Sequence, residues 1–341
     1  MYLLPKPKTI KEQDGQMLLC HSTHIVMTKE VAETEMHAAK RLQEAIRQET
    51  GLILPFSVGE VREGDLSLGI VKTLPEQTYE ITIDEKGGQI SGGDGAGVLY
   101  GVETFCQIVQ QCGGILPCVQ IQDAPDMPNR GYYFDQTRGR VLKLEELKKI
   151  ADRMCRYKLN QLQLYVEHTY LFRDFSEMWR DQTPLTAEEI RELDSYCRER
   201  HIELVPSLAS FGHLCTLLST KTYGDLCEME DSWKEPFSFW NRMRYHTINV
   251  SDERSLPLIK KMIVEYMQLF TSDKFNICAD ETFCLGKYKS KKHAEERGVH
   301  RLYIDYVKEL AQFLVENGKI PMFWGDIIWN SPELMKELPE S

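Results

Sequence analysis

The chain has 341 residues, 42% of them apolar and 27% charged, a globular mixture with room for two domains and no stretch apolar enough for a transmembrane helix. Its formal net charge of −11 argues against a surface for nucleic acids or anionic membranes. Ten cysteines without a Cys-x-x-Cys pair, and no secretory signal, favour free thiols in the cytoplasm over a zinc site or a disulfide scaffold.

The first 125 residues are predicted to form a small α+β domain that carries no catalytic constellation. An amphipathic helix is expected over residues 31–49, where apolar residues recur on one face. Alternating apolar residues predict strands at 66–70, 79–83 and 89–91, and a second helix is expected at 98–111. The glycine-rich stretch between them, residues 92–97, lacks the Lys-Ser/Thr ending of a phosphate-binding loop and is interpreted as a tight connection.

A proline-rich polar stretch, residues 123–129, has the character of a domain boundary. After it, apolar strands alternate with amphipathic helices. The strands are expected at 131–135, 161–167, 203–210, 275–281 and 320–328, and the helices between them at 144–157, 186–200, 256–270 and 301–317. Such alternation is typical of parallel strands joined by crossover helices.

Polar side chains follow each of these five strands. The five ends carry Asp135 and Arg138, Glu167 and His168, Ser210 and His213, Asp280 and Glu281, and Trp324 and Asp326. Because catalytic residues sit at the carboxyl ends of strands in a (β/α) barrel, this regularity favours an active site there. Taken alone, Asp280 could cap a helix and Glu281 could be a solvated residue of its first turn. Both side chains can reach one cleft only if the strand bends where it ends.

Residues 126–341 are therefore expected to form an α/β catalytic domain, a (β/α)8-type TIM barrel preceded by the α+β domain of residues 1–125. Only about five β/α units are present, whereas a barrel of eight units typically needs about 250 residues. An open parallel edge would leave backbone groups unpaired. The barrel is thus expected to be incomplete at its C-terminus, and the chain to be a fragment that lacks the last three units.

Four motifs stand in this order along the chain: Arg130-Gly131-Tyr132-Tyr133-Phe134-Asp135-Gln136-Thr137-Arg138, Lys158-Leu159-Asn160, Phe211-Gly212-His213 and Asn276-Ile277-Cys278-Ala279-Asp280-Glu281. Their order and spacing resemble glycoside hydrolase family 20, the β-N-acetylhexosaminidases. Where that family has His-x-Gly-Gly-Asp-Glu, this chain has Asn276, Cys278 and Ala279 before the acid pair. These differences resemble a divergent branch that includes hexosaminidase D-type and bacterial intracellular enzymes.

The resemblance implies removal of a terminal, non-reducing β-linked N-acetylhexosamine, with the substrate's own acetamido oxygen as the nucleophile. Glu281 would be the general acid and then the base, and Asp280 would orient the acetamido group. Arg138 would bind sugar hydroxyls through its fork of donors. Further residues at strand ends are candidates for substrate contact: Glu167, His168, His213, Trp324 and Asp326. A carbohydrate substrate is implied, and neither a metal ion nor another cofactor.

Two other functions remain compatible with these residues. A barrel that binds carbohydrate without catalysis would fit the altered motif around Asn276. A retaining glycosidase of another class would use Glu281 as a covalent nucleophile. Within the resemblance itself, the sugar could be a glucosamine or a galactosamine derivative.

Overall fold

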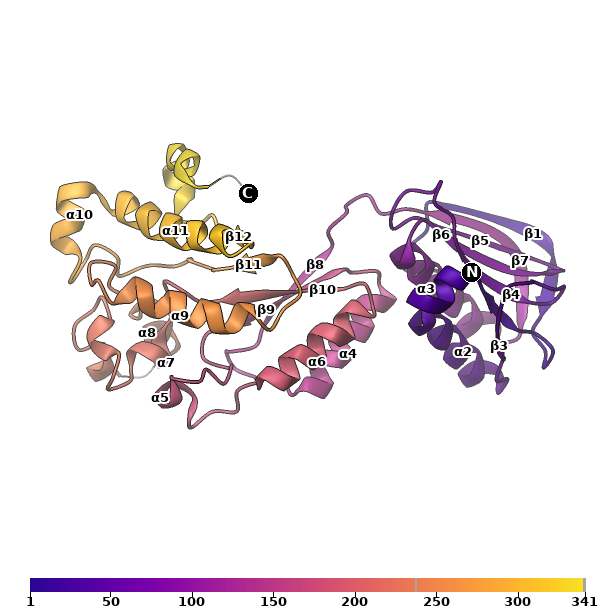
Figure 1. Ribbon diagram of the computed structural model, residues 1–341, viewed down its shortest axis with the longest axis horizontal. Coiled ribbons are helices and arrows are strands. Elements are labelled where there is room, and N and C mark those ends of the chain that lie inside the picture. The colour runs from indigo at the N-terminus through magenta and orange to yellow at the C-terminus, as the bar shows by residue number, and fades with distance from the viewer. Residues whose placement is uncertain (237, 340–341) are drawn as a thin grey trace. The chain divides into compact units, whose positions relative to one another are not determined.

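The computed structural model describes residues 1–236 and 238–339 and divides into two compact units (Figure 1). The first unit contains Met1–Gly131 together with Lys148–Gln161 and Tyr196–Ile202. The second contains Tyr132–Leu147, Leu162–Ser195 and the described chain from Glu203 onward. The boundary at residue 125 remains a prediction, and each unit is described by itself below.

The first unit is built on a seven-stranded mixed sheet in the order β1-β7-β5-β6-β4-β2-β3. Its elements are β1 (Thr9–Leu18), β2 (Ile25–Met27), α1 (Lys29–Thr34), α2 (Met36–Thr50), β3 (Phe56–Val58), β4 (Leu66–Ile70), β5 (Tyr79–Asp84), β6 (Gly87–Gly92), α3 (Gly95–Cys112) and β7 (Ile115–Asp123). Antiparallel pairing joins β1, β7, β5 and β6, and parallel pairing joins β6, β4, β2 and β3. Helix α3 packs against the sheet, and α2 packs against α3 (Figure 1).

The glycine-rich connection between β6 and α3 allows the backbone to pack closely. A Cβ atom on Gly97 would lie only 2.2 Å from the carbonyl oxygen of Thr78. The Asp94 side chain accepts a hydrogen bond from the Gly97 amide at 2.7 Å and so caps the first turn of α3. The stretch is thus a tight strand-to-helix connection.

The single helix predicted over residues 31–49 is wrong, because α1 ends at Thr34 and α2 begins at Met36. Glu35 between them leaves the helical conformation, with φ −122° and ψ 26°. Its carboxylate is buried and lies 2.8 Å from Nε2 of His201. A break held by a partner 166 residues away cannot be recognised from the local apolar pattern.

The second unit is built on a five-stranded parallel sheet in the order β12-β11-β10-β9-β8. Its strands are β8 (Gly131–Asp135), β9 (Gln161–Val166), β10 (Glu203–Leu208), β11 (Lys274–Asn276) and β12 (Ile320–Met322). Two helices are divided between the units: α4 (Leu144–Arg156) has only its first turn in the second unit, and α6 (Ala187–Arg198) has most of its length there. The other helices of the second unit are α5 (Ser176–Trp179), α7 (Cys215–Leu218), α8 (Phe239–Arg244), α9 (Ser255–Met267), α10 (Lys291–Arg297) and α11 (Val299–Glu316), with short 3₁₀ turns η1 (Gly224–Leu226), η2 (Ser232–Lys234), η3 (Ile328–Asn330) and η4 (Pro332–Glu337). Spatial order follows chain order, as in a partial (β/α) barrel.

Helices cover this sheet as the alternating pattern predicts. Helix α9 contacts β10, and α11 contacts both α9 and β12 (Figure 1). The rings of Tyr266 and Phe275, from α9 and β11, are fully buried and meet edge to face with centroids 6.4 Å apart. Among the described residues, no helix has an apolar span long enough to cross a bilayer.

Two of the five predicted strands end five or six residues earlier than expected. Strand β11 ends at Asn276 rather than at residue 281, and β12 ends at Met322 rather than at residue 328. At β11 the reason is local, because Cys278 and Ala279 adopt positive φ angles of 59° and 62°. These angles end the extended conformation before the acid pair.

Candidate active site

The acid pair lies on a strained turn that follows β11. Cys278, Ala279 and Glu281 all have positive φ, a region that costs a residue with a Cβ atom about 1–2 kcal/mol. Three consecutive carbonyl groups in this turn accept one hydrogen bond each from elsewhere in the unit: Ile277 from the Ser210 hydroxyl at 2.6 Å, Cys278 from the Trp324 amide at 2.9 Å, and Ala279 from the Tyr303 hydroxyl at 3.0 Å. The surrounding structure therefore holds the turn in its strained shape.

This turn brings both acids to one imidazole. The Nε2 atom of His213 lies 3.4 Å from Oδ2 of Asp280 and 3.3 Å from Oε2 of Glu281. The imidazole is buried, whereas the Asp280 and Glu281 side chains remain 26% and 41% exposed and are accessible to a ligand. Two neighbouring carboxylates beside a shared imidazole can divide the tasks of proton transfer and charge stabilisation.

The loop after β10 can approach this turn because residue 212 is a glycine. A Cβ atom on Gly212 would lie 2.6 Å from the carbonyl oxygen of Asp280. The next residue, His213, has a φ of 60°, so the backbone is also in the left-handed region there. The Phe211-Gly212-His213 motif therefore places the imidazole directly against the acid pair.

Arg138 lies in a second group of charged residues in the same unit. Its Nε atom donates to Oδ2 of Asp135 at 2.7 Å and lies 3.7 Å from Oε1 of Glu167. The guanidinium carbon stands 4.8 Å from the centre of the Tyr165 ring. Asp135 thus orients Arg138.

Glu167 is almost completely buried at the end of β9. The Tyr165 hydroxyl donates to its Oε1 at 3.0 Å, and Nη2 of Arg242 donates to its Oε2 at 3.0 Å. Burial raises the pKa of Glu167, whereas the positive charges of Arg242 and then Arg138 oppose this shift.

Three further candidates have different surroundings. His168 is buried, its Nδ1 lies 3.2 Å from the Thr216 hydroxyl, and burial lowers its pKa to about 4, so the imidazole is neutral near pH 7. The Trp324 side chain is 41% exposed and meets Tyr133 edge to face, with ring centres 5.1 Å apart. Asp326 is exposed, and its Oδ2 accepts from the Glu281 amide at 3.4 Å.

Arg242 and Met243, on the short helix α8, contact the candidate residues but were not predicted from the sequence. Arg242 bonds Glu167, and Sδ of Met243 lies 3.2 Å from Nη1 of Arg138. The one signal available in the sequence was indirect. A carboxylate predicted at the end of a buried strand requires a cationic partner, and the segment between β10 and α9 carries several arginines.

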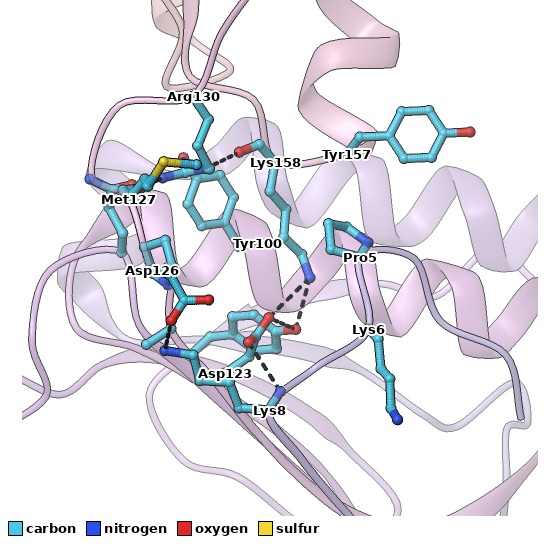
Figure 2. Close-up of a pocket in the computed structure, with 14 residues that line it drawn as sticks. Pro5, Lys6, Lys8, Tyr100, Asp123, Asp126, Met127, Arg130, Tyr157 and Lys158 are labelled. Carbon is cyan, nitrogen blue, oxygen red and sulfur yellow. Dashed lines mark hydrogen bonds and ion pairs between the residues drawn. The ribbon is translucent and has the colours of Figure 1, made fainter.

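The Lys158-Leu159-Asn160 motif lies in the first unit, beside a cavity of about 230 Å³ (Figure 2). The Lys158 ammonium points into a polar cluster, donating to the Tyr79 hydroxyl at 2.8 Å and lying 3.5 Å from Oδ2 of Asp123. Oδ1 of Asn160 accepts the Arg130 amide at 2.7 Å, and Nε of Arg130 donates to the Lys158 carbonyl at 2.7 Å. The motif therefore ties these segments of the first unit together.

Burial of this ammonium makes the stability of the fold depend on pH. Desolvation lowers the pKa of Lys158 from 10.5 to about 8, although Asp123 opposes the shift. A lysine pKa below its unfolded value opposes folding at neutral pH, and this penalty disappears as pH rises toward the unfolded value. Relative to Lys158→Met, the wild-type free energy of unfolding should rise by about 2 kcal/mol between about pH 7 and about pH 9.5.

Urea unfolding monitored by circular dichroism across this pH range measures the difference. Lys40→Met, at an exposed position on α2, is the matched control and should show no such slope. A constant difference between the wild type and Lys158→Met would contradict the burial argument.

Comparison with known proteins covers both parts of the chain. Residues 1–124 match the family model described as glycosyl hydrolase family 20, domain 2, and residues 128–339 match that of the glycosyl hydrolase family 20 catalytic domain. A beta-hexosaminidase of Porphyromonas gingivalis is 24% identical over 96% of this chain and 45% of the relative, and one of Vibrio furnissii is 26% identical over 82% and 48%. The crystal structure of a Bacteroides fragilis beta-N-acetylhexosaminidase has the same fold, with a TM-score of 0.77 at 19% identity, covering 96% of this chain and 67% of that chain. The chain spans about half the length of the curated relatives it matches.

Proposed function

The chain belongs to glycosyl hydrolase family 20, and on this premise we propose that the complete protein is a β-N-acetylhexosaminidase. It would remove terminal, non-reducing β-linked N-acetylhexosamine from a glycan or glycoside. The observation that carries the proposal is the meeting of the Asp280 and Glu281 carboxylates at Nε2 of His213. The beta-hexosaminidase names of the Porphyromonas and Vibrio relatives support the same activity.

The proposed reaction has two steps and retains the anomeric configuration. In the first, the substrate's acetamido oxygen bonds to the anomeric carbon as the glycosidic bond breaks, and Glu281 gives its proton to the departing oxygen. Asp280 accepts the acetamido N–H and stabilises the positive charge of the resulting oxazolinium ring. In the second, water adds to the anomeric carbon, the ring opens, and Glu281 takes up the proton of that water.

Arg138 is proposed to bind the hydroxyls of the terminal sugar. Its Nε atom is committed to Asp135, which leaves the outer edge of the guanidinium for a ligand, beside Met243. A guanidinium suits two adjacent hydroxyls because its donors lie in a fixed plane. Trp324 is proposed to offer an exposed ring to a sugar face, and Asp326 to hold the Glu281 backbone. Glu167, His168 and His213 would form the buried inner wall.

The divergent turn sequence around Cys278 and Ala279 also supports placing the protein in the branch that resembles hexosaminidase D-type enzymes. We propose a cytoplasmic location with it, on the support of ten cysteines that all carry free thiols.

A pair of aryl glycosides tests the activity in the full-length protein. The aryl N-acetyl-β-glucosaminide or galactosaminide should be cleaved at least roughly 10³-fold faster than the matching glycoside without the acetamido group, because only the former supplies an intramolecular nucleophile. Equal rates would refute substrate assistance, and a trapped covalent sugar on Glu281 would indicate the other retaining mechanism. Sugar binding by calorimetry without any hydrolysis would instead identify a carbohydrate-binding protein.

A further inference from the structure

The Glu167 carboxylate is buried, and the groups on its own strand do not fully replace the solvation that it loses. Only 3% of the residue is exposed, and its Oε1 accepts the Tyr165 hydroxyl. Arg138 stands 3.7 Å away, beyond hydrogen-bond distance, and its Nε already donates to Asp135. A buried carboxylate in such a setting tends to take up a proton unless a cation is bound to it directly.

The cation that bonds Glu167 directly lies on α8, in the long connection between β10 and α9. Arg242 Nη2 donates to Glu167 Oε2 at 3.0 Å, and the arginine side chain is only 18% exposed. The neighbouring Trp240 is 70% exposed, so α8 turns Arg242 inward. Nε of Arg242 is buried and has no acceptor among the described residues. Within the same described part of the chain, Glu167 is the one side chain that accepts a hydrogen bond from the Arg242 guanidinium.

Other titratable groups also face Glu167 from the surrounding elements. These are Arg138 after β8, Tyr165 and His168 on either side of it, His213 after β10, Cys215 on α7, and Cys278 after β11. Among all the groups around Glu167, Arg242 is the cation in hydrogen-bond contact and the one that lowers the pKa of Glu167 most. Arg138 and His213 have weaker effects in the same direction.

We propose that Arg242 is a positioning residue for the hydrolase activity proposed above, holding Glu167 as a carboxylate so that Glu167 can orient Arg138. Arg138 would bind the sugar, and His213 contacts both members of the acid pair. A protonated Glu167 would lose its attraction for the Arg138 guanidinium, which would then be less fixed. Helix α8 would therefore act on the site through the positive charge of Arg242.

A merely structural ion pair would behave differently. If the pair only anchored α8 to β9, removing Arg242 would loosen the packing of α8 and would not act through the proton of Glu167. In that case the loss of Arg242 would lower activity equally at all pH values. If Arg242 controls the proton of Glu167, the loss of Arg242 must lower activity mainly at low pH.

The test uses Arg242→Met and Arg242→Lys in the full-length protein, with an aryl N-acetyl-β-glucosaminide. Removing the positive charge raises the pKa of Glu167, so the acid limb of the kcat/KM profile for Arg242→Met should move up by at least about one pH unit. On the acid limb, kcat/KM falls about tenfold for each unit by which the pH is lowered. Arg242→Lys, which keeps the charge, should restore most of the wild-type profile. Arg244→Met, at an exposed position on the same helix, is the matched control and should leave the limb in place.

A second measurement does not depend on activity. At about pH 6, Arg242→Met should show an additional infrared band of a protonated carboxyl group, beyond any in the spectra of the wild type and of the double variant Glu167→Gln/Arg242→Met. The double variant also avoids the buried unpaired charge that could prevent folding. Absence of this band together with an unshifted acid limb would overturn the proposal. If the wild type does not hydrolyse the glycoside, the proposed function fails, and the band alone then decides whether Arg242 holds Glu167 ionised.

Discussion

Replacing Glu281 by glutamine is expected to lower kcat on N-acetyl-β-hexosaminides with poor leaving groups by about 10²- to 10⁴-fold. Glutamine keeps the shape of the side chain but has no proton to give to the departing oxygen. The side chain is 41% exposed, so stability should change little. Substrates with dinitrophenol-like leaving groups need less protonation, and the loss should be smaller with them. Steady-state kinetics on two aryl glycosides with different leaving groups measures both effects.

Glu296→Gln is the control for the same substitution at an exposed site on α10, away from the acid pair. It should keep wild-type kcat. Retention of about half the wild-type rate by Glu281→Gln would mean that another group is the acid. Recovery of a fast rate on the activated glycoside alone would support the assigned role.

Replacing Asp280 by asparagine is expected to lower kcat/KM by about 10²- to 10³-fold, the usual result of losing one group that stabilises transition-state charge. Asparagine can still contact His213, which lies 3.4 Å from Oδ2 of Asp280. It has no negative charge to oppose the oxazolinium. Kinetics with the acetamido substrate, and competition by free N-acetylglucosamine, measure the loss of rate and of sugar binding separately.

The control for this second variant is Asp305→Asn on α11, where the acid pairs with Arg297 and Arg301 outside the site. Its kinetics should match the wild type. An Asp280→Asn protein that cleaves the acetamido substrate at the wild-type rate would remove the main argument for substrate assistance.

The partial barrel was predictable because its apolar strands are short, regular and separated by amphipathic helices. Strands β8, β9 and β10 lie within two residues of their predicted ends. In the first unit, four strands were missed: β1, β2, β3 and β7. Strand β1 reads Thr-Ile-Lys-Glu-Gln-Asp-Gly-Gln-Met-Leu and is mostly exposed, so it lacks the alternating apolar signal that marks a half-buried strand.

The acid pair was predictable because two carboxylates after an apolar segment are unusual. The conformation of the turn before them was not, since neither Cys278 nor Ala279 suggests a left-handed backbone in the way that glycine does. The carbonyl partners that hold the turn come from residues as distant as Ser210 and Trp324. Arg242 escaped prediction for a related reason, because its partner is 75 residues away and α8 has only six residues.

The strained turn before Asp280 determines how the proposed activity would be lost on heating. Its geometry depends on donors from three separate parts of the second unit, the hydroxyls of Ser210 and Tyr303 and the backbone amide of Trp324. Loosening any one contact lets the peptide relax toward ordinary angles, and this relaxation requires no melting of the sheet. Thermal inactivation would then precede the loss of secondary structure, with the carboxyl groups moving apart while the helices are still intact.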